Sequence, residues 1–204
     1  MTILYAVTLA LFLQNAGSPN VGPAATSEAD AINCRLDVPS YMQFAMAING
    51  EEKLAQTRRW KRVASRNAFM NEYDLPRAII VGAHSTRRIA FTSNAILAIL
   101  DLPDPTTLAV SEQVENAMDA APMIDALVGT GKMTRAQAEA VVPFRKFMGE
   151  RILKDVTEPA VRGESYGSHS IVARTISNAT THPGKTFYGC SYRLEMLDQN
   201  GAPL

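Results

Sequence analysis

The chain has 204 residues, a length that suits one domain with a sizeable core and is too short for two. Hydrophobic residues make up 47% of it and charged residues 20%, which are ordinary values for a globular protein. The formal net charge is zero, so no field of the whole molecule attracts nucleic acid, and we do not expect a nucleic-acid partner.

The first residues form an apolar leader. Residues 2–13 carry no charge and are followed by small and polar residues. A run of this length is too short to span a bilayer but suits the core of a signal peptide. We therefore predict a signal peptide over residues 1–16 and a periplasmic or secreted protein. An uncleaved membrane anchor and a buried N-terminal strand or helix remain as alternatives.

Residues 17–31 are rich in Gly, Pro, Ala, Ser and Thr, which predicts a flexible linker. The chain contains two cysteines, Cys34 and Cys190. Because an exported chain meets an oxidising compartment, we predict a disulfide that ties the start of the mature chain to its final strand. The alternative is two unrelated buried thiols that behave as small hydrophobic groups.

The C-terminal region predicts an antiparallel β-hairpin over residues 168–197. Residues 170–177 are rich in β-branched side chains, and residues 178–184 are typical of a turn. The second strand alternates strictly, with one side formed by Tyr188, Cys190, Tyr192, Leu194 and Met196. A two-stranded ribbon is only marginally stable alone, so this side must pack on the rest of the chain.

The apolar spacing of the preceding chain favours helices. We expect them over residues 39–48, 51–73, 86–100, 107–121 and 134–156, with a further turn after Pro122. Thr134 and Gln137 have the spacing of a capping box, and Pro143 is expected to break the last helix. Residues 78–81 suit either a strand or a helix. The expected fold class is α+β, mainly α: a single domain over residues 32–200 with about five to seven helices and a C-terminal hairpin.

Charges are segregated along the chain. Residues 53–66 carry six basic side chains and no acid, whereas residues 89–131 carry no basic side chain. One interpretation is a basic helix that contacts an anionic surface or an acidic protein partner. Its expected contact residues are Arg58, Arg59, Arg62 and Arg66, with Trp60 available for stacking. The alternatives are a solvated helix face, a basic helix beside an acidic one, and self-association through the complementary patches.

One short motif suggests catalysis. Residues 163–167, Gly-Glu-Ser-Tyr-Gly, match the G-x-S-x-G pattern of a nucleophile elbow, with Ser165 as nucleophile and His169 or His182 as base. However, a strand rather than a helix is expected to follow, and no acid lies between Ser165 and His182. An ordinary glycine-rich turn explains the pattern equally.

No cofactor or metal is predicted. The three histidines share no ligand spacing with each other or with the cysteines, and residues 129–133 lack the first Gly and the Ser or Thr of a phosphate-binding loop. The sequence thus favours an exported, disulfide-linked protein that binds a partner or has a structural role, and not an enzyme. The alternatives are a small secreted serine hydrolase and a membrane-tethered structural subunit.

Overall fold

The protein is built around a seven-stranded antiparallel sheet. A computed structural model describes residues 22–118, 120–141, 146–161 and 163–204. Strand order across the sheet is β1-β2-β3-β4-β7-β6-β5, so β7 lies in the interior, between β4 and β6. The strands are β1 (Lys61–Val63), β2 (Asn71–Val81), β3 (His84–Phe91), β4 (Ala95–Leu100), β5 (Met148–Glu158), β6 (Gly167–Ser177) and β7 (Thr186–Leu197).

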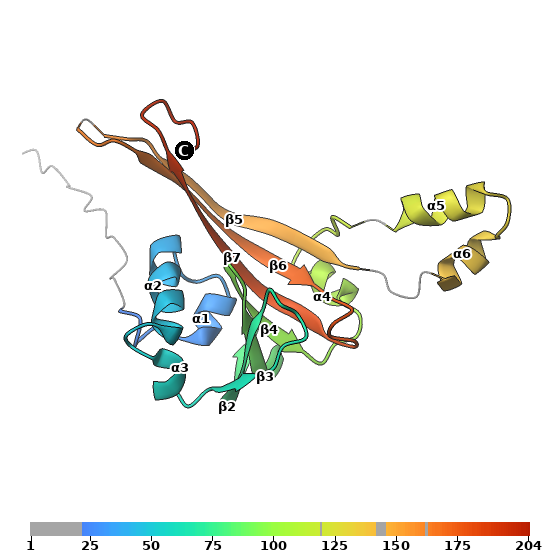
Figure 1. Ribbon diagram of the computed structural model, residues 1–204, viewed down its shortest axis with the longest axis horizontal. Helices are drawn as coiled ribbons and strands as arrows, with labels where there is room; N and C mark the ends of the chain where they lie inside the picture. Colours follow the sequence, from blue (N-terminus) through green and yellow to red (C-terminus); the bar gives the residue numbers. More distant parts are fainter. Residues whose placement is uncertain (1–21, 119, 142–145, 162) are drawn as a thin grey trace, which may run out of the picture.

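Within these described ranges six helices accompany the sheet: α1 (Glu28–Ile32), α2 (Val38–Asn49), α3 (Leu54–Thr57), α4 (Thr106–Ser111), α5 (Ala121–Gly129) and α6 (Arg135–Val141). Figure 1 shows α1, α2 and α3 gathered against one side of the sheet. It also shows the α5–α6 hairpin standing away from the sheet. None of the helices in the described part of the chain is long and apolar enough to cross a membrane.

The expected mainly helical fold is wrong, because the structure is mainly β. The basic segment 53–66 forms no continuous helix, since α3 ends at Thr57 and β1 begins at Lys61. Lys53 and Arg59 adopt positive φ values of 47° and 59°, a left-handed conformation that a right-handed helix does not tolerate. The buried residues of this segment are Leu54 and Ala55 in α3 and Trp60 in the loop after it, whereas β1 is largely exposed.

The expected helix over residues 86–100 is also wrong and is instead the β3–β4 hairpin. All six residues of β4, Ala95–Leu100, are buried. A strand covered on both faces is a continuous apolar run, which periodicity does not distinguish from a buried helix. Thr92 closes the β3–β4 turn: its backbone N–H donates to the carbonyl of Ala95, and its hydroxyl accepts from the Ala95 N–H.

Two further segments differ from the expected helices. The segment 107–121 overlaps the short helix α4, which ends at Ser111, and contains only the first residue of α5. In the segment 134–156 the capping box is present: the Gln137 N–H donates to the Thr134 hydroxyl and the Thr134 N–H donates to the Gln137 side chain. Helix α6 follows it and β5 begins at Met148, whereas Pro143 lies outside the described residues. Residues 78–81 belong to strand β2.

The two C-terminal strands pair as antiparallel neighbours, from Gly167 opposite Leu197 to Ser177 opposite Phe187. The side chains of Tyr188, Cys190 and Tyr192 are buried in the main core, under the helices. Phe187 is buried on the opposite face, in a smaller cluster with β4 residues. The hairpin is therefore part of a larger sheet, because β4 also pairs with β7.

A disulfide joins Cys34, just after α1, to Cys190 near the centre of β7, with a Cα–Cα distance of 5.3 Å. This confirms the predicted covalent link. The expected linker over residues 17–31 includes helix α1 from Glu28 onward, whose first turn is capped by the Ser27 hydroxyl. The predicted signal peptide, residues 1–16, lies outside the described residues.

Candidate functional site

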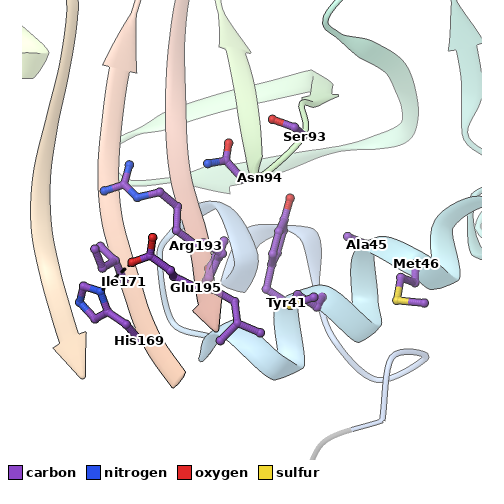
Figure 2. Close-up of a pocket in the computed structure, with 12 residues that line it drawn as sticks. Tyr41, Ala45, Met46, Ser93, Asn94, His169, Ile171, Arg193 and Glu195 are labelled. Atoms are coloured by element: carbon purple, nitrogen blue, oxygen red, sulfur yellow. Dashed lines mark ion pairs between the residues drawn. The ribbon is translucent and has the colours of Figure 1, made fainter. Parts of the chain in front are cut away.

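The main candidate site is a groove beside the outer half of β7. It has a volume of about 660 Å³ and lies between helix α2, the β3–β4 turn and the ends of β6 and β7. Figure 2 shows Tyr41, Ala45 and Met46 on α2, apart from the labelled strand residues. The register places His169, Ile171, Arg193 and Glu195 on the sheet face opposite Tyr192 and Leu194, so the groove borders both faces of the sheet edge. We call it the β7 groove, and its lining residues are Tyr41, Met42, Ala45, Met46, Ser93, Asn94, His169, Ile171, Tyr192, Arg193, Leu194 and Glu195.

Aromatic stacking fixes one wall of the β7 groove. The Tyr41 and Tyr192 rings stack with centroids 4.0 Å apart and an interplanar angle of 12°. The Tyr192 hydroxyl donates to the backbone carbonyl of Ala31 at 2.7 Å, so helix α1 holds this ring in place as well. Burial raises the pKa of both phenols, so both stay neutral. This wall is rigid and apolar, with Met42 and Met46 of α2 exposed beside it.

The floor of the β7 groove is an incomplete sheet edge. Strand β4 begins at Ala95, which pairs with Ser191, and beyond it the Tyr192 N–H donates to the Asn94 carbonyl at 2.7 Å. Backbone groups of alternate residues in an antiparallel strand point to the same side. The N–H and C=O of Leu194 therefore point towards the same edge as the Tyr192 N–H, beyond the end of β4.

The next position along this edge is already occupied. The Leu204 N–H donates to the Met196 carbonyl at 3.0 Å, and Pro203 forms an isolated bridge with Leu197. Leu194 thus lies between two segments of the chain that each pair with β7. This leaves one residue of β7 whose backbone donor and acceptor face the groove.

The charged rim of the β7 groove comes from three adjacent strands. His169 Nε2 lies 2.8 Å from Asp155 and its Nδ1 lies 3.7 Å from Glu195. The hydrogen bond with Asp155, opposed by slight desolvation and helped by Glu195, raises the pKa of His169 above its usual value. Arg193 pairs with Glu150 at 2.5 Å.

This rim is not arranged as a metal centre. The two carboxylates beside His169 approach opposite nitrogens of its ring, so they do not converge on one ion. Across the described part of the chain, no group of three His, Cys, Asp or Glu side chains is placed to hold a metal.

The three candidate catalytic residues lie on different elements of the structure. Ser165 is exposed in the connection between β5 and β6, with a strand rather than a helix after it. His169 lies near the start of β6, whereas His182 lies beyond its end, in the β6–β7 loop. The strand between them from His169 to Ser177 spans roughly 26 Å at the usual rise per residue. The two histidines therefore do not meet in one site.

His182 instead satisfies a buried carboxylate. Its Nε2 lies 3.0 Å from Oε1 of Glu72, a residue only 2% exposed, and its Nδ1 lies 2.9 Å from the Thr181 hydroxyl. Arg88 approaches the other Glu72 oxygen at 3.6 Å. A buried carboxylate is costly unless it is paired, so this histidine has a structural explanation.

The predicted basic contact residues divide into two groups. Arg58 faces inward: it donates to Glu28 at 2.7 Å and to the Thr26 carbonyl at 2.7 Å, and its guanidinium lies 5.8 Å from the ring centroid of Trp60. Trp60 itself is buried, at 8% exposure. By contrast, the side chains of Arg59, Arg62 and Arg66 are exposed around β1.

Sequence reasoning missed a second buried ionic group. Arg174 is 5% exposed; it donates to the Ile32 and Gly189 carbonyls, and its Nε lies 3.2 Å from Glu112. The Tyr188 hydroxyl donates to the same carboxylate at 2.8 Å, and burial raises the pKa of Tyr188 to about 12. This cluster connects the chain after α4 to the centre of the sheet, next to the disulfide.

The β7 groove was also missed, because its lining comes from segments far apart in the sequence. The exposed Met42 and Met46 are the one local signal, since apolar side chains on the outer side of a surface helix often mark a contact surface. Comparisons of the chain with protein-family models, with curated proteins and with solved structures found no match. The geometry of the β7 groove and of the exposed basic residues is therefore the basis for assigning a function.

Proposed function

We propose that this protein is exported and acts by binding a ligand in the β7 groove, without catalysing a reaction. The observation that carries the proposal is the groove itself, in which a rigid apolar wall, an unpaired sheet edge and a charged rim meet. Binding sites are typically concave and mostly apolar, with a few polar groups that orient the ligand. His169 and His182 each pair with carboxylates, and no contact found among the described residues joins either of them to Ser165, so catalysis has much weaker support.

The disulfide is compatible with a location outside the cytoplasm, because such links persist in oxidising compartments. A periplasmic or secreted location rests further on the apolar leader of the sequence. Intact mass of protein produced with its own leader tests this part: loss of the first residues supports export, and an uncleaved chain supports the membrane-tethered alternative.

Groove binding can be tested by thermal unfolding with three probes of different chemistry: a pool of short peptides, a fatty acid and a heparin oligosaccharide. A ligand at about 100 times its Kd adds about 2.7 kcal/mol to the free energy of unfolding. For a chain of this size that raises Tm by roughly 5–10 °C. The groove-filling variant Ala45→Trp should lose the shift, whereas Gln43→Trp, on the same helix but outside the groove lining, should keep it.

The proposal fails if no probe raises the Tm of the wild type by more than it raises the Tm of Ala45→Trp. A fluorophosphonate that labels the wild type but not Ser165→Ala would instead support the hydrolase alternative.

A second candidate is an anionic partner bound at the exposed basic residues. Its support is the cluster of Arg59, Arg62 and Arg66 around the edge strand β1, where the exposed Lys61 adds a fourth charge. Replacing the three arginines with Gln should weaken heparin binding and flatten its salt dependence. Unchanged heparin binding would identify these side chains as a solvated surface.

A further inference from the structure

We propose that the β7 groove receives a short extended peptide, which pairs with Leu194 as an added strand and carries an apolar residue flanked by basic ones. This inference rests on the proposed function of the β7 groove and specifies its ligand.

The unpaired edge defines the backbone part of the site. The Leu194 N–H and C=O point past the end of β4, between the contacts that Asn94 and Leu204 make with β7. The Leu204 contact shows that this edge accepts a second chain segment by strand pairing. The interval between Tyr192 and Met196 spans about 13 Å, which accommodates roughly three residues of an extended peptide. Addition of a strand to a sheet edge is a common mode of peptide recognition.

The helix side of the groove selects an apolar side chain. Leu194 has the same orientation as Tyr192 and Cys190, which face the helices, and residues opposite each other in a sheet share a face. A peptide residue opposite Leu194 therefore points towards α2. There it meets Met42 and Met46, which are 40% and 73% exposed, and the exposed Leu194 side chain. Methionine is flexible and adapts to different apolar partners.

The opposite side of the groove selects positive charge. The two peptide residues flanking the apolar one point to the face that carries Arg193 and Glu195. Arg193 is already paired with Glu150. Three carboxylates, Asp155, Glu195 and Glu150, surround this arginine and His169, so acids exceed permanent cations. The Glu195 side chain is 53% exposed, and its one ionic contact is with His169 Nδ1 at 3.7 Å. This carboxylate can therefore pair with a Lys or Arg of the peptide.

The test uses two labelled pentapeptides with blocked ends, Val-Lys-Leu-Lys-Val and Val-Glu-Leu-Glu-Val, in fluorescence anisotropy. The lysine peptide should bind the wild type at least about tenfold more tightly than the glutamate peptide. Glu195→Gln should reduce this preference. The charge-matched control Glu139→Gln, on helix α6 away from the sheet (Figure 1), should leave it unchanged.

Strand pairing has its own readout. In an added strand, the amide groups of alternate peptide residues point towards β7, and the others point away from it. N-methylation of the amides that point towards β7 should abolish binding, whereas N-methylation of the others should be tolerated. Leu194→Pro, which lacks the outward N–H, should bind about tenfold more weakly than Leu194→Ala, which retains it. Because the methylated peptides are tested on the wild type, the result does not depend on folding of the proline variant.

The inference is overturned if neither peptide binds, if both bind equally, or if both methylation patterns are tolerated. Absence of peptide binding together with a fatty-acid shift that Ala45→Trp removes would leave the proposed function intact and refute only the peptide. Failure of all the groove probes would refute both.

Discussion

Removal of the Cys34–Cys190 disulfide is expected to cost the protein a large part of its stability. The two cysteines are 156 residues apart, so the link closes most of the described chain into one loop. Chain-entropy arithmetic for a loop of this length gives about 5 kcal/mol at 25 °C, and measured values are often lower. The free energy of unfolding of whole domains is about 5–15 kcal/mol. The double variant Cys34→Ala/Cys190→Ala should therefore be marginal.

Urea unfolding of the oxidised wild type, the thiol-reduced wild type and the double variant measures this effect. The reduced wild type and the double variant should unfold at similarly low urea concentrations. Their m-values should be larger, because an unlinked chain exposes more surface when it unfolds. Reductant should not change the double variant. Free energies of the oxidised and reduced wild type that agree within about 1 kcal/mol would refute the assignment of the disulfide as the main covalent constraint.

Three further predictions follow from individual contacts. Arg58→Gln should lower the free energy of urea unfolding by about 2–3 kcal/mol, because it leaves the largely buried Glu28 carboxylate and two backbone carbonyls without their partner. The control Arg62→Gln, at an exposed position, should lower it by less than about 0.5 kcal/mol. Equal losses for the two variants would contradict the inward position of Arg58. Gly189→Ala should prevent folding or lower the free energy of unfolding by more than about 4 kcal/mol, since its Cβ would overlap a backbone carbonyl of β4. The control Gly129→Ala places its Cβ in open space and should be tolerated. A stable Gly189→Ala protein would show that β4 and β7 separate at this position. The raised pKa of His169 means that its contribution to stability is fully present below its unfolded-state value and is lost as the pH rises through the folded-state value. Wild type should therefore exceed His169→Gln in stability more at about pH 5 than at about pH 8, and a difference independent of pH would argue against the ionic contacts of this histidine.

The sequence was most informative where the local pattern and the tertiary environment agree. In strand β7 the larger side chains Tyr188, Cys190 and Tyr192 alternate with the small residues Gly189 and Ser191, so its two-residue period is visible in the sequence although both faces are buried. Helix α2 is marked by Asp37, whose side chain accepts from the Ser40 N–H, and by Gly50 at its end. In both cases a local rule was enough, because no distant contact opposed it.

The sequence was misleading where burial of a strand on both faces removes the alternation of apolar and polar residues. Strand β4 is covered on both faces, so its apolar residues do not alternate. Strand β5 carries a bulge between Ile152 and Lys154, which shifts its register and places Ile152 and Val156 on opposite faces. Neither strand has a period that separates it from a helix, and this is why the expected fold was mainly helical.

The candidate site depended even more on long-range structure. The sequence determined which residues carry charge, and it indicated that the two cysteines pair. It did not determine that Arg58 turns inward, since the carboxylate that receives it lies thirty residues earlier in the chain. The β7 groove exists because β4 ends before β7 does and helix α2 packs beside the remaining edge. Relative strand length and helix placement result from packing over the whole sheet, so only the tertiary structure decided where the candidate groove lies.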